Sequence, residues 1–387
     1  MGLRGLMDRE RSPTVSDIMD ATRHRLVVGD SQAMPSIPDG SIDLVVTSPP
    51  YPMIEMWDSL FSSRNPGVAK ALDALDGPAA FQLMHRDLDM VWSEIARVLK
   101  PGGWACVNIG DATRKVGERF QLYPNHALVT GRFLSLGFDD LPLIVWRKQT
   151  NAPNKFMGSG MLPAGAYVTL EHEYILIMRK GAKREFASGP QRLARRTSAF
   201  FWEERNTWFS DIWDFKGTRQ ALEHPDLRAR SAAFPLELPY RLINMYSVRG
   251  DTVLDPFVGT GTTTFAAMAS GRHSIGIEFD PSLVNTIIGS CAALTPLLNR
   301  RIEDRIREHL AFVESCRENG RELKHRNRPH GFPVMTLQET DLELRFIAEV
   351  RPVAGNELAV TYRGEPAGPT SEGGERHAQL TLSLENG

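Results

Sequence analysis

A glycine-rich turn is the segment of the sequence with the clearest chemical character. It reads Asp-Pro-Phe-Val-Gly-Thr-Gly-Thr-Thr over residues 255–263, between a short apolar strand and a predicted helix. A P-loop would end in Gly-Lys-Ser or Gly-Lys-Thr, and this turn has no lysine to reach a phosphate. Asp255 would repel a pyrophosphate, but it suits a cation such as S-adenosyl-L-methionine, whose ribose hydroxyls could donate to Glu278 at the next strand end. The alternative is a tight turn with no ligand.

A proline-rich turn, Ser48-Pro49-Pro50-Tyr51, follows a nearly continuous apolar strand predicted over residues 42–47. Two successive prolines fix φ and remove two N–H donors, so backbone carbonyls of the turn can point outward unpaired. Such carbonyls accept hydrogen bonds from an amino group, and the Ser48 hydroxyl is a further acceptor. Tyr51 offers a flat face on which a planar base can stack. A plain structural turn is the alternative, but it would have to coincide by chance with the glycine-rich turn.

Both turns belong to an alternating pattern of apolar strands and amphipathic helices, which predicts a doubly wound α/β sheet. Residues 52–78 are predicted as an irregular insertion, and residues 141–146 and 173–178 as two strands of a hairpin. The other predicted strands cover residues 25–30, 42–47, 104–109, 252–254 and 273–277, and the predicted helices residues 84–98, 126–136, 239–246, 262–270 and 296–319.

The residues from Pro333 onward have a different pattern, in which apolar and polar residues alternate. This two-residue spacing is typical of half-buried strands. Three strands of a small β appendage are therefore predicted, around residues 342–346, 358–362 and 380–384.

The composition is that of an ordinary globular chain, with 387 residues, 42% hydrophobic and 24% charged. This length suggests about two domains, or one large domain with insertions. No apolar run approaches the roughly 18 residues of a membrane-spanning helix, and the polar N-terminus has no signal-peptide core, so a cytoplasmic protein is expected. Cys106, Cys291 and Cys316 are too widely spaced for a metal site, and no metal is expected.

One segment of this otherwise balanced chain is strongly basic. Residues 179–205 hold eight Lys or Arg and three Asp or Glu, a net charge of +5. Three consecutive aromatic residues, Phe200, Phe201 and Trp202, lie near its end. Basic residues interleaved with aromatic ones predict contacts with nucleic acid. The alternative is a solvated loop with its aromatic residues in the core.

Together these motifs resemble those of the DNA amino-methyltransferases, which methylate the N4 of cytosine or the N6 of adenine. The catalytic motif of that family is Asp, Asn or Ser followed by Pro-Pro and Tyr or Phe, and it matches residues 48–51. Its cofactor motif matches residues 255–263. The catalytic motif comes first, as in the β group of the family. Residues 99–103, 171–176 and 233–239 also match in order, so the resemblance covers roughly residues 24–290.

The resemblance implies a Rossmann-like doubly wound methyltransferase sheet, circularly permuted, with an inserted target-recognition region and a small C-terminal β appendage. The parts implied are an N-terminal tail (1–22), a catalytic half (23–180), a target-recognition and DNA-binding region (181–232), a cofactor-binding half (233–330) and the β appendage (331–387).

The resemblance also implies roles for single residues. Asp30 and Phe279 are expected beside the cofactor's adenine, Glu278 at its ribose, and Phe234 and Pro235 at its methionine end. Apart from the resemblance, the position of Gln149, Asn151 and Asn154 between the two predicted hairpin strands makes them candidates to bond the target base. The expected catalytic residues are Ser48, Pro49, Pro50 and Tyr51; the expected cofactor-binding residues are Asp30, Phe234, Pro235, Asp255, Phe257, Gly259, Gly261, Thr262, Thr263, Glu278 and Phe279; and the expected DNA-binding residues are Arg192, Arg195 and Arg196.

The expected reaction is direct displacement on a base that has left the duplex. Hydrogen bonds to Ser48 and to the Pro49 carbonyl would favour a pyramidal amino nitrogen whose lone pair faces the sulfonium methyl group. No covalent intermediate is needed, and none of the three cysteines follows a proline, as the nucleophile of C5-cytosine enzymes does.

Ser at the first motif position leans to N4 of cytosine in this family, while Asp leans to N6 of adenine. N4-cytosine methylation of double-stranded DNA is therefore expected, with N6-adenine methylation as the alternative.

Two other classes of protein are alternatives to a DNA methyltransferase. Related enzymes that act on RNA or on protein glutamine carry Asn-Pro-Pro-Tyr where this chain has Ser-Pro-Pro-Tyr. A catalytically dead paralogue that only binds nucleic acid would usually lose one of the two motifs, and both are present here. A cognate restriction endonuclease and a second copy of the chain are further candidate partners, in a prokaryotic or phage-encoded restriction-modification system.

Overall fold

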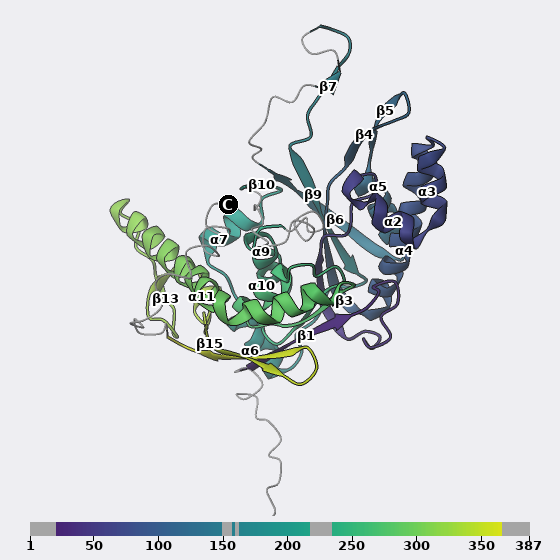
Figure 1. The fold of residues 1–387 in the computed structure, drawn as a ribbon. Helices are drawn as coiled ribbons and strands as arrows, with labels where there is room; N and C mark the ends of the chain where they lie inside the picture. The colour runs from purple at the N-terminus through teal and green to yellow at the C-terminus, as the bar shows by residue number, and fades with distance from the viewer. Residues whose placement is uncertain (1–20, 149–156, 159–161, 217–233, 366–387) are drawn as a thin grey trace, which may run out of the picture.

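The computed structural model describes residues 21–148, 157–158, 162–216 and 234–365, and within them ten strands form one central sheet (Figure 1). In chain order the strands are β1 (Ala21–Val28), β2 (Ile42–Thr47), β3 (Leu99–Ile109), β6 (Phe138–Arg147), β9 (His172–Lys180), β10 (Ile212–Asp214), β11 (Thr252–Asp255), β12 (His273–Glu278), β15 (Phe346–Val353) and β16 (Glu357–Arg363). Their order across the sheet is β10-β6-β9-β3-β2-β11-β12-β1-β16-β15.

The middle of the sheet is parallel and circularly permuted. Strands β3, β2, β11, β12 and β1 run in the same direction. Strands β11 and β12 come late in the chain, yet they lie between β2 and β1, which come first. Every residue of β2 is buried, as expected of a parallel strand covered on both faces. The predicted fold class is confirmed.

Helices pack on both faces of the sheet. One face carries α2 (Asp58–Arg64), α3 (Pro66–Asp73), α4 (Gly77–Val98) and α5 (Asn125–Ser135), whose buried residues share one core with Val45 of β2. The other face carries α7 (Trp202–Trp208), α9 (Glu237–Tyr246), α10 (Thr262–Ser270) and α11 (Pro281–Glu318), which share a second core with Val46. Neighbouring residues of a strand point to opposite faces, which is why Val45 and Val46 belong to different cores.

The prediction of an irregular insertion over residues 52–78 was wrong. A short 3₁₀ helix, η1 (Glu55–Trp57), is followed by α2 and α3. Asn65 caps α3 by accepting a hydrogen bond from the N–H of Gly67, and Pro66 occupies the first turn. Asp76 caps α4 in the same way. These caps satisfy N–H groups at the helix starts and make such short helices stable.

The C-terminal hairpin of β15 and β16 is present, but it is not a module apart from the sheet. Strand β16 pairs antiparallel with β1 over Ala21–Arg25. An exposed edge of β1 would leave a row of unpaired N–H and C=O groups, and β16 covers it. Leu342 and Leu344 pack in a third core with Phe201 and Phe346 instead of forming a strand. The strand predicted at residues 380–384 lies outside the described residues.

Helix α11 is longer than predicted, and the first half of the helix is its most apolar part. One 18-residue window has a mean hydropathy of 1.4, so by length and composition alone this helix could cross a membrane. This corrects the expectation that no segment reaches that length. Leu283, Val284 and Ile287 of this window are buried in the core, while 33% of the window as a whole is buried. One such helix is weak evidence for a membrane span, because the core helix of a soluble protein passes the same test.

Two hairpins project from one edge of the sheet (Figure 1). One joins β4 (Ala112–Val116) and β5 (Arg119–Tyr123), and the other joins β7 (Met157–Gly158) and β8 (Ala166–Tyr167). Phe120 and Tyr167 bring the two together, with ring centroids 4.8 Å apart. A third hairpin, of β13 (His325–Arg326) and β14 (Pro333–Val334), follows α11.

Candidate active site

The carboxyl ends of the parallel strands bring the two sequence motifs together. Ser48 directly follows β2, Asp255 ends β11, Glu278 ends β12 and Asp30 lies two residues after β1. Strands β2, β11, β12 and β1 are consecutive neighbours in the sheet. Ligands of open α/β sheets bind at this edge, beyond the carboxyl ends of the strands.

The carboxylate of Asp255 connects the proline-rich turn to the glycine-rich turn. Its Oδ1 accepts hydrogen bonds from Thr47 Oγ1 at 2.6 Å and from the N–H of Phe257 at 3.0 Å. Its Oδ2 accepts from Thr263 Oγ1 at 2.6 Å. Thr47 precedes Ser48, and Thr263 lies in the first turn of α10. One buried side chain therefore positions both turns.

Burial raises the pKa of Asp255 to about 6, although the hydrogen bonds from Thr263 and Thr47 act in the opposite direction. The carboxylate is desolvated, since only 3% of the residue is exposed. A positive charge placed nearby would favour the ionised form. The site is thus chemically suited to a cationic ligand.

The glycine-rich turn has room for glycine alone at one position. Gly261 has φ +88°, and a Cβ there would lie 2.9 Å from Ile287 Cγ1. Thr262 begins α10 directly after it. Phe257, on the other side of the turn, packs edge-on against Trp92 of α4 with ring centroids 6.4 Å apart. The turn is therefore held between the helices of both faces.

Glu278, at the end of the neighbouring strand β12, forms hydrogen bonds that hold the glycine-rich turn in place. Its Oε2 accepts from the N–H of Gly259 at 2.9 Å, and its Oε1 accepts from the N–H of Asp280 at 3.0 Å. Burial raises the pKa of Glu278 above its usual value. Each carboxylate oxygen has a second lone pair, so hydroxyl donors of a ribose could still bind.

Three side chains meet beside Glu278, and one of them was missed by the sequence analysis. Phe279 is 66% exposed, as a face for an adenine would be. Arg64 of α2 pairs with Asp30 at 3.0 Å, and its guanidinium carbon lies 5.5 Å from the ring centroid of Phe279. Arg64 lies in the segment predicted to be irregular, and nothing in its sequence context singles it out.

The proline-rich turn contacts a buried polar network. Tyr51 Oη donates to Glu173 Oε2 at 3.0 Å and accepts from Asn108 Nδ2 at 2.8 Å. Ser48 Oγ lies 3.0 Å from the same phenol oxygen. The only phenol hydrogen is used on Glu173, so Ser48 must donate to Tyr51. The two lone pairs of the Ser48 hydroxyl then stay available to accept from an amino group.

Glu173, Asn108 and Lys148 were not predicted as site residues. Asn108 Nδ2 also donates to Glu173 Oε2 at 2.6 Å, and the Lys148 ammonium pairs with Glu173 Oε1. Burial and the nearby Glu173 raise the pKa of Tyr51 well above its usual value. Residues 171–176 were a sequence match to the family, but no feature of the sequence connected Glu173 to Tyr51, which lies 122 positions earlier.

The structure places the other predicted residues less directly at the site. Tyr51 is only 8% exposed, and its ring lies 3.0 Å from where a Cβ of Gly110 would be, so it leaves little surface for a stacked base. Pro49, Pro50, Phe234 and Pro235 are buried. Phe234 belongs to the core that α9 and α10 share. Gln149, Asn151 and Asn154 lie outside the described residues.

The structure does not bring Arg192, Arg195 and Arg196 to the edge that carries Ser48. They lie on α6 (Gly189–Thr197), at the opposite end of the sheet from the β4–β5 hairpin (Figure 1). Arg184, just before α6, pairs with Asp251 at 2.7 Å and with Asp43 at 3.5 Å. Both acids lie at the amino ends of their strands, β11 and β2.

Phe200, Phe201 and Trp202 of the basic segment each pack against another aromatic ring, and Trp202 stays 37% exposed. Phe201 is fully buried and stacks on His309 of α11 with ring centroids 3.9 Å apart. Trp202 stacks on Phe312, and Phe200 packs on Trp208. Of the three, Phe201 therefore fits the structural alternative, an aromatic residue in the core.

A permuted doubly wound sheet with both turns at its carboxyl edge defines a Rossmann-like methyltransferase. More narrowly, the chain belongs to the DNA methylase family of N6 and N4 enzymes, whose model matches residues 42–289.

Similar proteins support this family assignment. The Type II methyltransferase M.MthZI of Methanothermobacter thermautotrophicus is 50% identical over 344 residues, which cover 88% of this chain and 96% of that protein. M.MjaI of Methanocaldococcus jannaschii is 50% identical over 273 residues, 68% of this chain and 89% of that protein. A crystal structure of TTHA0409, a putative DNA modification methylase from Thermus thermophilus in complex with S-adenosyl-L-methionine, matches with 34% identity and a TM-score of 0.53, over 69% of this chain and 93% of that one.

The predictions of family, fold class and cofactor are thereby confirmed. The domain boundaries and the roles of single residues stay predictions.

Proposed function

We propose that this protein transfers the methyl group of S-adenosyl-L-methionine to the exocyclic N4 of cytosine in double-stranded DNA. The observation that carries the proposal is the buried carboxylate of Asp255, which bonds Thr47 beside the proline-rich turn and Thr263 beside the glycine-rich turn, each at 2.6 Å. A methyl donor and a base held by these two turns meet at the same edge of the sheet. The catalytically dead alternative is disfavoured because both turns are intact and connected.

In the proposed reaction, Ser48 Oγ accepts one hydrogen of the target amino group, and the Pro49 carbonyl accepts the other. The amino nitrogen becomes pyramidal, and its lone pair attacks the sulfonium methyl group; the carbon–sulfur bond breaks as the carbon–nitrogen bond forms, and S-adenosyl-homocysteine leaves with the electron pair of the broken bond. The methylated nitrogen, now positively charged, then releases one of its two protons to solvent water, which leaves the neutral N-methyl base. Positioning and electrostatics supply the rate. The chain's contribution is to fix Ser48 through Tyr51, with Glu173 and Asn108 fixing Tyr51 in turn.

The choice of base rests on Ser48, because Ser at this position leans to cytosine in the family. Methylation of N6 of adenine is the alternative. The decisive experiment incubates the protein with S-adenosyl-L-methionine and genomic DNA that lacks amino-methylated bases, and identifies the nucleosides by mass spectrometry. N4-methyldeoxycytidine would support the proposal, N6-methyldeoxyadenosine would overturn the base only, and neither product despite cofactor binding would overturn DNA as the substrate.

The names of the relatives support a role in a restriction-modification system, since M.MthZI and M.MjaI are Type II methyltransferases. In such a system the protein would act on chromosomal DNA in the cytoplasm. A cognate endonuclease would cut the unmethylated site. Assembly as a homodimer stays a proposal that sedimentation of the purified chain would test.

We infer that DNA lies along the edge that carries Ser48, against the β4–β5 hairpin. Strand β3 ends at Ile109 on this edge, and the hairpin projects from it. Lys115 and Arg119 of the hairpin are exposed. Arg195 and Arg196, on α6, lie at the opposite end of the sheet. A flipped base stays attached to the backbone of its duplex, so phosphate contacts are expected near the pocket.

We expect the double change Lys115→Gln and Arg119→Gln to weaken DNA binding and to reduce the salt slope of log K by roughly two, about one for each phosphate that the protein no longer neutralises. The matched control is Arg195→Gln with Arg196→Gln, which removes the same charge and should leave the slope unchanged. Fluorescence anisotropy over a range of salt concentrations measures both. A reduced slope in the Arg195 and Arg196 variant, with an unchanged slope in the Lys115 and Arg119 variant, would place the DNA-binding surface on α6, as the sequence alone suggested.

Glu173 is proposed as a positioning residue for Ser48, acting through Tyr51. We expect Glu173→Gln to lower kcat roughly tenfold to a hundredfold, because the amide no longer offers Tyr51 a charged acceptor. The dissociation constant of S-adenosyl-L-methionine and the KM for DNA should change little. The matched control is Asp139→Asn, since Asp139 forms a surface ion pair with Arg179 at the far end of β9. Equal losses in kcat and in cofactor affinity would indicate a structural role instead.

A further inference from the structure

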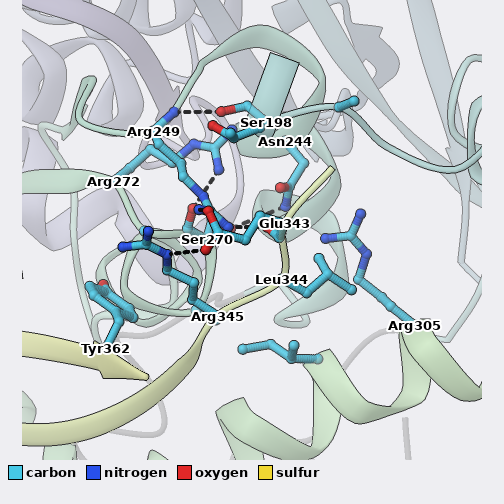
Figure 2. A pocket seen from close by; sticks show the side chains of 15 residues that line it. Ser198, Asn244, Arg249, Ser270, Arg272, Arg305, Glu343, Leu344, Arg345 and Tyr362 are labelled. Atoms are coloured by element: carbon cyan, nitrogen blue, oxygen red, sulfur yellow. Dashed lines mark hydrogen bonds and ion pairs between the residues drawn. The ribbon is translucent and has the colours of Figure 1, made fainter. Parts of the chain in front are cut away.

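A small cavity lies at the C-terminal end of α10, where Ser270 and Gly271 line it (Figure 2). Its volume of about 30 Å³ has room for two or three water molecules, since each needs roughly 10–15 Å³ by the same measure. The glycine-rich turn lies at the other end of this nine-residue helix. An adenine is too large for the cavity, so the adenine of the cofactor must bind on the open surface beside the glycine-rich turn.

On that surface, Arg64 lies over the exposed ring of Phe279. The guanidinium carbon of Arg64, the last residue of α2, is 5.5 Å from the ring centroid. A guanidinium is planar and weakly hydrated, so it stacks on flat aromatic faces. Phe279 is nevertheless 66% exposed, so the guanidinium does not close off the ring from solvent. The two groups form the walls of a site that a ligand can reach, which we call the Arg64–Phe279 site.

The Arg64–Phe279 site is slightly too narrow for an adenine in the free protein. Atoms in contact lie roughly 3.5–4.0 Å apart, so a flat ring between two flat groups needs roughly 7–8 Å between them. The guanidinium would therefore have to withdraw by roughly 2 Å. The Arg64 side chain is 24% exposed and has a flexible stem, so a rotation of the stem can supply this movement.

The backbone of Arg64 is fixed, so the side chain can move without the helix. Asp58, at the start of α2, accepts two hydrogen bonds from Arg114 of β4, at 2.8 and 2.6 Å. Phe61, in the middle of α2, is buried. Asn65, directly after Arg64, caps α3. These contacts hold both ends of the short helix in place.

Asp30 joins Arg64 to the position expected for the amino group of the adenine. Arg64 Nη1 donates to Asp30 Oδ1 at 3.0 Å, and the N–H of Gln32 donates to the same oxygen at 2.9 Å. No side chain or backbone N–H of the described residues donates to Oδ2, which is left to accept from an amino group. The ion pair therefore places an acceptor for the edge of an adenine beside the guanidinium that would cover its face.

Asp87 of α4 adds a second negative charge near Arg64. Its Oδ2 is buried and has no hydrogen-bond partner in the part of the chain that the structure describes. Burial raises the pKa of Asp87, the hydrogen bond from Asn65 and the charge of Arg64 lower it, and Asp30 raises it. Arg64 thus interacts favourably with two acids, which keeps its guanidinium close to Phe279 while the stem moves.

We propose that Arg64 is a cofactor-binding residue that covers the adenine of S-adenosyl-L-methionine on the face opposite to Phe279. The guanidinium withdraws from the ring, stacks on the adenine, and keeps its ion pair with Asp30, whose second oxygen accepts from the adenine amino group. This inference rests on the proposed roles of Phe279 and Asp30, but it is independent of which base the enzyme methylates.

The test is calorimetric titration of the full-length protein with S-adenosyl-L-methionine, S-adenosyl-homocysteine and 5′-methylthioadenosine, which share adenosine and differ at the methionine end. Arg64→Gln should weaken the binding of all three by the same factor, about fivefold to tenfold, the value of one cation–π contact. Arg64→Lys keeps the charge beside Asp30 but has no flat surface, so most of the loss should remain. The Tm of both variants should stay close to that of the wild type, because the contacts of Asp58 and Phe61 are unchanged.

Two control variants accompany these titrations. Arg23→Gln removes an arginine that forms a similar ion pair, with Glu357 at 2.8 Å on β16, and it should bind all three ligands as the wild type does. Phe279→Ala removes the other wall of the Arg64–Phe279 site and should weaken the binding of all three.

The outcomes separate the role of Arg64 from the adenine site itself. If Phe279→Ala weakens binding and Arg64→Gln does not, the inference about Arg64 is wrong and the adenine site stands. If neither change weakens binding, the adenine binds elsewhere and both assignments are wrong. A loss confined to the two ligands with a methionine end would assign the effect of Arg64 to that end. Full recovery in Arg64→Lys would show that charge alone acts, and either result would overturn the stacking contact.

Discussion

Ser48→Ala should lower the rate of methyl transfer by about a hundredfold or more while cofactor affinity changes less than about twofold. The reason is the direction of its hydrogen bond. Tyr51 Oη gives its only hydrogen to Glu173, so the Ser48 hydroxyl donates to Tyr51 and keeps both lone pairs for the substrate amino group. Removing one preorganised hydrogen-bonding group at a reacting centre costs about 10²–10³ in rate. Alanine keeps the turn, since Pro49 and Pro50 fix its backbone.

Single-turnover kinetics with a saturating cofactor, together with calorimetric binding of S-adenosyl-L-methionine, measures this effect. Ser63→Ala is the matched control, because Ser63 is a serine of α2 whose hydroxyl donates to the carbonyl of Leu60 within its own helix. Tyr51→Phe should reproduce most of the loss, since Ser48 then has no partner to orient its hydrogen. Full activity of Ser48→Ala would remove this residue from the catalytic assignment.

The sequence was sufficient to predict the elements that carry both turns. The fully buried run of β2 and the apolar spacing of α4 follow from periodicity, which depends only on neighbours along the chain. The placement of β11 beside β2 came from the resemblance to a permuted family, not from the residues. Once that order is assumed, the meeting of Ser48 and Asp255 follows, because carboxyl ends of parallel strands share an edge.

Contacts between distant residues could not be predicted in the same way. Glu173 reaches Tyr51 because β9 runs antiparallel to β3, which periodicity alone does not reveal. The basic segment illustrates the opposite error. Its charge suggested a DNA contact, but charge says nothing about which end of the sheet a helix occupies. The ion pairs of Arg184 with Asp43 and Asp251 hold it at the amino end.

Asp255→Asn should weaken the binding of S-adenosyl-L-methionine by roughly tenfold to a hundredfold, the value of one charged hydrogen-bonding group. Asparagine has nearly the same shape, but it is neutral and has only one oxygen for the hydroxyls of Thr47 and Thr263. The substitution therefore weakens the hydrogen bonds that position the two turns, and it removes the negative charge that attracts the cofactor. Calorimetric titration with the cofactor measures the loss, and the matched control is Asp304→Asn, a change at a half-buried acid of α11 that pairs with Arg307. Unchanged cofactor affinity would exclude Asp255 from the cofactor site.

The pH dependence of cofactor binding distinguishes the effect of the negative charge of Asp255 from the effect of its hydrogen-bonding geometry. In the free protein burial holds the pKa of Asp255 at about 6, above its ordinary value of 3.8, so the folded state binds this proton more tightly than the unfolded chain does. The contribution of this group to stability is therefore present below pH 3.8 and is lost as the pH rises through about 6. A cationic cofactor favours the ionised carboxylate, so its affinity should be highest above pH 6 and fall by up to about tenfold per unit below it. Asp255→Asn has no such proton to release. Its cofactor affinity should stay flat through this range, and a fall parallel to that of the wild type would place the titrating group elsewhere.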